Sequence, residues 1–195
     1  MEITYGTDIV FDRVLSPLDK FTLSFCKQLN ALNIKYVLIS GYVAIVFGRN
    51  RTSEDVDIIV EPLSKERFEA LWSKLTKTFS CMQTTDAHTA YSEYLQDGIP
   101  LRFFIENPIP NMEVKFPTIQ AERETLTHRK KLVINSHTLY ISSIEMQIAH
   151  KLLLGSEKDI EDAVYLKEFF SEHIDEKALL FWAKKLNVDK ELELL

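Results

Sequence analysis

The stretch from Ile39 to Val60, which reads ISGYVAIVFGRNRTSEDVDIIV, carries the strongest indication of the fold class. It begins at the end of an apolar run, residues 36–39, whose strand-forming residues predict a buried strand. A Ser-Gly pair at 40–41 breaks that strand, and residues 42–47 fit a short helix closed by a glycine. The apolar residues 56–60 predict a second strand. This order of strand, glycine turn, short helix and strand indicates an α/β protein.

Two acidic residues in this stretch predict a metal site. Asp55 and Asp57 are two apart on the predicted strand, so their side chains leave the same face. Their mutual repulsion among apolar neighbours would be relieved by a bound Mg²⁺ or Mn²⁺, which prefers carboxylate oxygens. The alternative is a pair of solvated acids at the start of a strand. Aspartate is depleted in strands, which favours the metal site over this alternative.

The glycine turn and two arginines suggest a phosphate-bearing ligand. Gly41 stands fourteen residues before Asp55 and lets the backbone come close to a ligand. The first N–H groups of the following helix can donate to an anion. Arg49 and Arg51 lie between this turn and the acids, and guanidinium groups bind phosphate well.

The rest of the chain divides into a part with both helices and strands and a part with helices. Helices are expected at residues 16–33, 64–79, 142–155 and 157–170, and from 175 onward. Hairpins are expected to join residues 91–95 to 101–105 and residues 131–135 to 138–141. Ser142 has Glu145 three residues later, the spacing of a capping box. We therefore expect an α/β core over residues 1–142 and a helical part over residues 143–195, packed on the core because no flexible linker separates them.

Composition excludes several classes of protein. The 195 residues are 46% hydrophobic and 27% charged with a net charge of −6, which excludes a disordered chain and a nucleic-acid-coating protein. Two cysteines are too few for a disulfide scaffold. We expect no contact with a membrane, because no window approaches the ~18 apolar residues of a span. The N-terminus has no basic segment before an apolar run, so we expect no signal peptide and a cytoplasmic location.

Two separated motifs resemble one known family. The stretch Arg51-Thr-Ser53-Glu-Asp55-Val-Asp57 is similar to the R-x-T-x-D-h-D form of the nucleotidyltransferase superfamily, which has the polymerase-β-like fold. That form is typical of the AbiEii-like toxin nucleotidyltransferases and their uncharacterised relatives. Further on, Lys151 followed by Lys158-Asp159-Ile-Glu-Asp162 resembles the later element of that group, a lysine on one helix and K/R-D-x-x-D on the next.

The resemblance implies a fold and a function. The fold would be a nucleotidyltransferase-like small mixed sheet with flanking helices, followed by a helical C-terminal part. The function would be metal-dependent transfer of a nucleotidyl group from an NTP to an unknown acceptor, either RNA or protein. The chain would be the toxin-like component of a toxin–antitoxin system, with an antitoxin as its partner.

The resemblance also implies roles for individual residues. The catalytic residues would be Asp55, Asp57, Lys151 and Asp159, of which Asp55 and Asp57 would hold Mg²⁺ or Mn²⁺, with two ions about 3.5–4 Å apart in a two-metal site. The nucleotide would be bound by Ser40, Gly41, Tyr42, Arg49, Arg51 and Ser53. From the residues alone, Lys151 could equally be an exposed lysine, and Asp159 and Asp162 could be acids favoured by a helix N-terminus.

Two departures from the family pattern leave a second function open. The turn reads Gly41-Tyr42 where the family usually has Gly-Gly or Gly-Ser, so the bulky Tyr42 would narrow the site or stack on a nucleotide. Many members carry a third carboxylate on a later strand, and the expected position holds Arg102. A catalytically inactive protein that binds nucleotide or regulates a partner is therefore the alternative.

Overall fold

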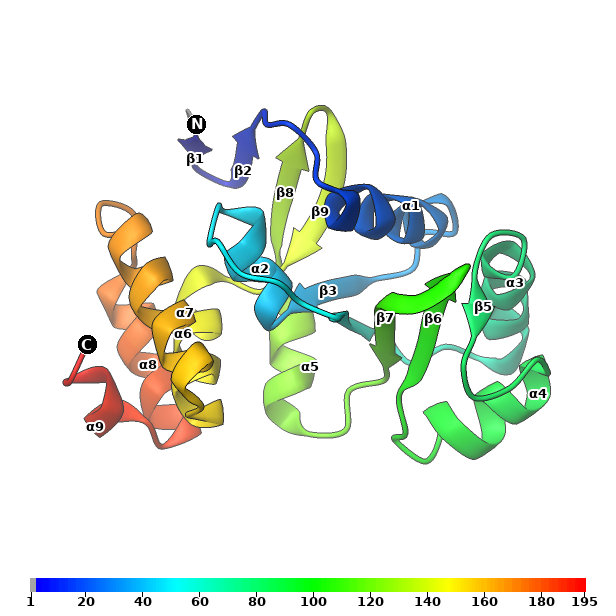
Figure 1. Cartoon of the computed structure of the whole chain (residues 1–195). Coiled ribbons are helices and arrows are strands. Elements are labelled where there is room, and N and C mark those ends of the chain that lie inside the picture. Colours follow the sequence, from blue (N-terminus) through cyan, green and yellow to red (C-terminus); the bar gives the residue numbers. More distant parts are fainter. Residues whose placement is uncertain (1–2) are drawn as a thin grey trace.

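A single mixed sheet forms the centre of the molecule in a computed structural model that describes residues 3–195 (Figure 1). Its nine strands are arranged in the order β1-β2-β8-β9-β3-β4-β7-β6-β5. The strands are β1 (Thr4–Tyr5), β2 (Asp8–Phe11), β3 (Tyr36–Ile39), β4 (Asp55–Val60), β5 (Ser80–Cys81), β6 (Leu101–Ile105), β7 (Asn107–Lys115), β8 (Lys130–Ile134) and β9 (His137–Ile141). The pairs β2–β8, β3–β9 and β4–β7 are parallel, and the others are antiparallel. The α/β class is therefore confirmed, with a larger sheet than the small one expected.

Helices pack on both faces of this sheet and at its ends. They are α1 (Pro17–Ala31), α2 (Gly41–Val46), α3 (Lys65–Leu75), α4 (Ala87–Thr89), the π-helix η1 (Ala90–Leu95), α5 (Gln120–Thr127), α6 (Ile144–Leu154), α7 (Glu157–Phe169), α8 (Glu176–Leu186) and α9 (Asp189–Leu192). The C-terminal helices α6–α9 gather at one end of the molecule, and α3 and α4 lie at the other (Figure 1). Within residues 3–195, no helix is both long enough and apolar enough to cross a membrane.

The two faces of β4 differ in character. Val56, Ile58 and Val60 are buried in the main hydrophobic core, which also contains apolar residues of the C-terminal helices. The opposite face carries the two acids and then Ile59, which packs with Leu126 of α5 in a separate small cluster. The acids therefore lie on the face that α5 covers only in part.

The expected hairpin between residues 91–95 and 101–105 is wrong. Residues 90–95 are helical, and β6 pairs instead with β5 and β7. Asp86 begins this helical segment by accepting a hydrogen bond from the backbone N–H of Thr89 at 2.7 Å. The apolar positions 90, 91, 94 and 95 have helical spacing, which outweighs their strand propensity once the cap is in place.

Pro108 and Pro110 lie within β7, where an interruption was expected. The register jumps there, because Ile105 pairs with Asn107 while Phe104 pairs with Asn111. The prolines occupy the extra residues of this bulge and so remove no hydrogen bond from the regular ladder that follows.

The start of α6 also differs from the expectation. The N-cap is Ser143, whose side chain accepts from the backbone N–H of Met146. The hydroxyl of Ser142 instead donates to the side-chain oxygen of Gln147 at 2.9 Å, and Glu145 accepts from the backbone of Asp175. The predicted capping box between Ser142 and Glu145 is therefore absent. Glu145 thereby links α6 to the segment before α8, while Ser142 binds a residue of α6 itself.

Candidate active site

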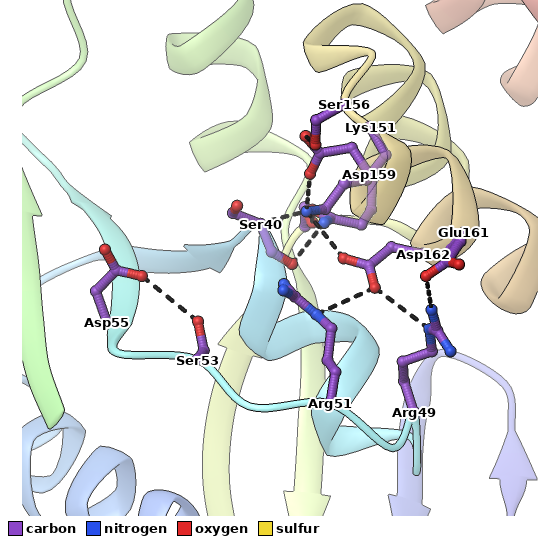
Figure 2. A network of polar contacts seen from close by, with 12 residues as sticks. Ser40, Arg49, Arg51, Ser53, Asp55, Lys151, Ser156, Asp159, Glu161 and Asp162 are labelled. Carbon is purple, nitrogen blue, oxygen red and sulfur yellow. Dashed lines mark hydrogen bonds and ion pairs between the residues drawn. The ribbon is translucent and has the colours of Figure 1, made fainter.

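Asp55 and Asp57 lie on β4 with their side chains on the same face, as the spacing predicts. Asp57 stands opposite Ile39, the last residue of β3, so the acids lie beside the turn that follows β3. The hydroxyl of Ser53 donates to Asp55 at 3.4 Å, a long hydrogen bond that helps to orient this carboxylate (Figure 2).

A third carboxylate, which sequence reasoning missed, stands next to these two. Glu113 of β7 is the parallel neighbour of Asp57, so both side chains project from the same face of the sheet. Arg102, expected at the position of the third acid, lies one strand further out on β6, opposite Glu113. Its guanidinium binds Glu113 at 2.5 Å. The expectation that Arg102 replaces the third acid is therefore wrong.

The protein concentrates uncompensated negative charge at Asp57. Burial is the largest cause that raises the pKa of Asp57, and together with the neighbouring charges of Asp55 and Glu113 it brings this pKa to about 6. A polar contact with the Ser40 side chain and the more distant charge of Lys115 oppose this rise without cancelling it. The site therefore favours either a proton or another cation at Asp57.

The carboxylates of Asp55, Asp57 and Glu113 are the type of donor that binds a divalent cation. Within residues 3–195, no three Asp, Glu, His or Cys side chains already stand in the arrangement of a metal-ligand cluster. The donors are nevertheless hard carboxylate oxygens on one face, and both burial and the neighbouring acids disfavour the negative charge of Asp57. Carboxylate oxygens are the type of ligand that Mg²⁺ and Mn²⁺ prefer.

The turn after β3 is held in an unusual conformation at Ser40 rather than at Gly41. Ser40 has φ 61° and ψ −136°, a region that L-residues rarely adopt. Gly41 has a different reason to lack a side chain. A Cβ atom there would lie 2.1 Å from Nη2 of Arg51 and 3.4 Å from Oγ of Ser53. Arg51 and Ser53 thus cover the turn at very close range.

Tyr42 does not reach the site. Its side chain is fully buried in the main core, and its hydroxyl donates to Asp19 of α1 at 3.0 Å. The expectation that its ring narrows the site or stacks on a nucleotide is therefore wrong. Gly41 begins α2, and Tyr42 is its second residue, which points into the core; a linear motif cannot reveal this direction.

Arg49 and Arg51 are bound to acids of α7 in a polar network (Figure 2). Nε of Arg51 lies 3.2 Å from Asp162, and Nε of Arg49 lies 3.5 Å from the same carboxylate oxygen. Arg49 also binds Glu161 at 2.6 Å. The positive charge expected to grip phosphate is therefore already paired with carboxylates.

Lys151 is the buried centre of the same network. Its Nζ lies 2.7 Å from Asp159 and 3.0 Å from Asp162, and its side chain is 1% exposed. The lysine thus lowers the pKa of Asp159 despite the opposing effect of burial, assisted by Ser156. Figure 2 shows Asp55 lying apart from this cluster. The structure brings Lys151 and Asp159 together, and Asp162 and Arg51 connect them to the turn.

Comparisons with known proteins identify the fold. No protein-family model and no curated protein matches the chain. Among solved structures, an antigenic nucleotidyltransferase-like protein from Paracoccidioides brasiliensis is 20% identical, with a TM-score of 0.55 over 90% of this chain and 88% of its own. The antibiotic-resistance factor ANT(2'')-Ia, in complex with adenylyl-2''-tobramycin, is 13% identical, with a TM-score of 0.56 over 88% of this chain and 98% of its own. A solution structure of the same factor gives a TM-score of 0.51 at 14% identity, over 90% of this chain and 97% of its own.

The chain has the nucleotidyltransferase fold. The match extends over most of both chains. Identities of this size establish the fold alone. The nucleotidyltransferase fold nevertheless gives the three carboxylates a structural context, because they stand on its central strands beside the turn.

Proposed function

We propose that the protein transfers a nucleotidyl group from an NTP to an acceptor hydroxyl in a metal-dependent reaction. The observation that carries this proposal is the group of three carboxylates, Asp55, Asp57 and Glu113, on one face of β4 and β7. A purely structural sheet would gain nothing from placing three acids together, because their repulsion disfavours the folded state. The nucleotidyltransferase fold supports the same reading.

Each of the three carboxylates has its own role in the proposed reaction. Asp55 and Asp57 hold Mg²⁺, or Mn²⁺ in its place, and orient the triphosphate against β4. The bound cation supplies positive charge to the triphosphate and lowers the pKa of the attacking hydroxyl. The hydroxyl oxygen forms a bond to the α-phosphorus, the bond from that phosphorus to the bridging oxygen breaks, and pyrophosphate leaves with the electron pair. Glu113 is positioned to accept the hydroxyl proton.

The remaining predicted residues act mainly by support. Ser40, Gly41 and Ser53 line the nucleotide side of the acids, where Ser53 already contacts Asp55. Arg49 and Arg51 are held by Asp162, so we assign them to fixing the loop over the turn, with Arg51 the nearer to a phosphate. Lys151 and Asp159 anchor that loop to the C-terminal helices.

The nucleotide, the acceptor and the partner are narrower proposals. The AbiEii-like motifs favour an RNA or protein acceptor, a toxin-like role, an antitoxin partner and a cytoplasmic location. ANT(2'')-Ia forms a complex with adenylyl-2''-tobramycin, so a small hydroxyl compound is a third acceptor class. All three classes present a hydroxyl, or a group of similar nucleophilicity, to the same carboxylates.

The test is incorporation of label into an acceptor. Purified protein would be incubated with Mg²⁺, each of four α-³²P-labelled NTPs, and total RNA, total protein or an aminoglycoside panel. We expect label in one acceptor class, lost on Asp57→Asn and on omission of Mg²⁺, and retained in Asp12→Asn, which removes an exposed acid elsewhere. Label that survives Asp57→Asn would contradict the proposal.

A second candidate function rests on the ion pair between Arg102 and Glu113. Because Arg102 binds this carboxylate at 2.5 Å, the third acid is less available to accept a proton. The protein would then bind a nucleotide with Mg²⁺ without transferring it, as a binding or regulatory module. Nucleotide binding that requires Asp57, together with no transfer to any acceptor, would favour this alternative.

A further inference from the structure

Gln147 of α6 holds the backbone of Ser40 by two hydrogen bonds. Its side-chain oxygen accepts from the Ser40 N–H at 3.1 Å, and its side-chain nitrogen donates to the Ser40 carbonyl at 2.7 Å. The Ser142 hydroxyl donates to the same side-chain oxygen at 2.9 Å, which fixes the amide in this orientation. Gln147 is fully buried and reaches across 107 positions of the chain.

This contact falls at the one residue of the turn with a strained backbone. Ser40 has φ 61° and ψ −136°, a conformation that glycine adopts freely and serine does not. A serine here persists only if neighbouring groups fix its peptide units. Gln147 binds both polar groups of that residue and therefore supplies this constraint.

The conformation of Ser40 matters because of what it faces. Ile39, its predecessor, is paired with Asp57, so Ser40 directly follows the residue that stands beside this acid. Its successor, Gly41, lies under Arg51 and Ser53. A change in the Ser40 peptide would thus shift Ser40 beside Asp57 and Gly41 beneath Arg51 at the same time.

We propose that Gln147 is a positioning residue, which holds the Ser40–Gly41 turn in the geometry that binds a metal-bound nucleotide beside Asp57. This role rests on the proposed function of the site. It also explains why α6 contributes to the site although Lys151, the residue of α6 expected there, is occupied by Asp159 and Asp162.

The experiment separates positioning from simple support of the fold. The probe is a non-hydrolysable ATP analogue with Mg²⁺, whose dissociation constant is measured by calorimetry beside the thermal midpoint of each variant. Ser40→Gly removes the backbone strain but leaves both backbone partners of Gln147 in place. The informative comparison is therefore Ser40→Gly against Ser40→Gly with Gln147→Met.

Loss of Gln147 leaves the polar backbone groups of residue 40 without these partners and should lower the thermal midpoint. Binding is therefore measured well below both midpoints, where we expect the loss of Gln147 to weaken analogue binding by about tenfold or more, the usual range for residues that orient ligands of a metal site. Gln147→Glu keeps the acceptor and loses the donor, so it should weaken binding in the otherwise unchanged protein. Asn135→Asp is its matched control, because Asn135 binds both backbone groups of Arg13 in the same manner. That control should retain the affinity.

Equal affinity in Ser40→Gly with and without Gln147→Met would overturn the positioning role. Binding of the analogue by Asp57→Asn distinguishes this outcome from failure of the proposed function. If Asp57→Asn abolishes binding while loss of Gln147 does not, only the positioning role is wrong. If the unchanged protein does not bind the analogue with Mg²⁺, both proposals are wrong.

Discussion

Asp57 of β4 and Glu113 of β7 stand side by side in neighbouring parallel strands, and both carboxylates leave the same face of the sheet. Burial, the charge of Asp55 and then the charge of Glu113 together raise the pKa of Asp57 to about 6. The folded protein therefore holds a proton on Asp57 more tightly than the unfolded chain does. This difference makes the stability of the protein depend on pH.

Asp57→Asn should stabilise the protein near neutral pH when no metal is present. Between the unfolded pKa of 3.8 and the folded pKa of about 6, the folded state binds more protons, so the free energy of unfolding falls as pH rises through this window. The shift corresponds to about 3 kcal/mol at pH 7. The stability difference between variant and wild type should thus be near zero at about pH 4 and grow to at most this value.

Urea denaturation of both proteins from about pH 4 to about pH 7 measures this difference. Asp12→Asn, which removes an exposed acid, is the control and should show no such growth. Added Mg²⁺ should stabilise the wild type and leave Asp57→Asn unchanged, because only the wild type retains both carboxylates of the pair. A stability difference that is flat across the window would contradict the charge cluster.

Arg102→Gln should increase the affinity of the acids for Mn²⁺. The variant frees Glu113 from its ion pair and removes a positive charge that competes with the cation. A partly exposed ion pair contributes about 0.2–1 kcal/mol, so the gain should be at most about fivefold. Electron paramagnetic resonance of free Mn²⁺ measures it.

Arg67→Gln provides a close control for that measurement. Arg67 binds Glu61 at 3.1 Å. The side chains of this pair are 47% and 22% exposed, which is close to the 42% and 20% of the pair formed by Arg102 and Glu113. Both variants change the net charge equally. An equal gain in both would attribute the effect to net charge and reject the specific role of Arg102.

Gly41→Ala should weaken nucleotide binding with little change in stability. The new Cβ atom would meet Nη2 of Arg51 at 2.1 Å, so this guanidinium must move away and its contact with Asp162 must change. Alanine favours a helix by about 1 kcal/mol relative to glycine, which offsets part of the disturbance because Gly41 begins α2.

Gly6→Ala is the matched control, because nothing lies within 4 Å of a Cβ atom at that position. The thermal midpoint and the affinity for Mg²⁺ with a non-hydrolysable ATP analogue should be measured for both variants. Unchanged affinity in Gly41→Ala would mean that the packing of Arg51 over the turn has no part in nucleotide binding.

Lys151→Met should be among the most destabilising single changes in the protein. It leaves Asp159 and Asp162, both buried, without their closest cation, and breaking a buried ion pair in this way costs about 3–5 kcal/mol. The double variant with Asp159→Asn should recover part of the loss. Thermal and urea unfolding measure both.

Lys65→Met tests whether any lysine would have this effect. Lys65 lies 3.9 Å from Glu69 in an exposed pair on α3, and its loss should change stability by less than about 0.5 kcal/mol. Similar losses in the two lysine variants would show that the network around Lys151 does not stabilise the fold in the way its burial indicates.

Several elements were predictable because their signals are local. Ser16 and Pro17 predict the start of α1, and the structure shows the capping box there. The hairpin of residues 131–141 was also predictable, because its two apolar runs flank a short polar turn. The segment at 91–95 was mispredicted because aromatic residues favour strands while their spacing and the cap at Asp86 favour a helix.

That Asp55 and Asp57 share one face follows from their spacing alone, because side chains alternate along any strand. That Glu113 stands beside them and that Gln147 holds Ser40 is visible only in the folded protein. These contacts depend on the pairing of β4 with β7 and on the packing of α6 against the turn after β3. Strand register and helix packing arise from the burial of side chains far apart in the chain, so no local pattern encodes them.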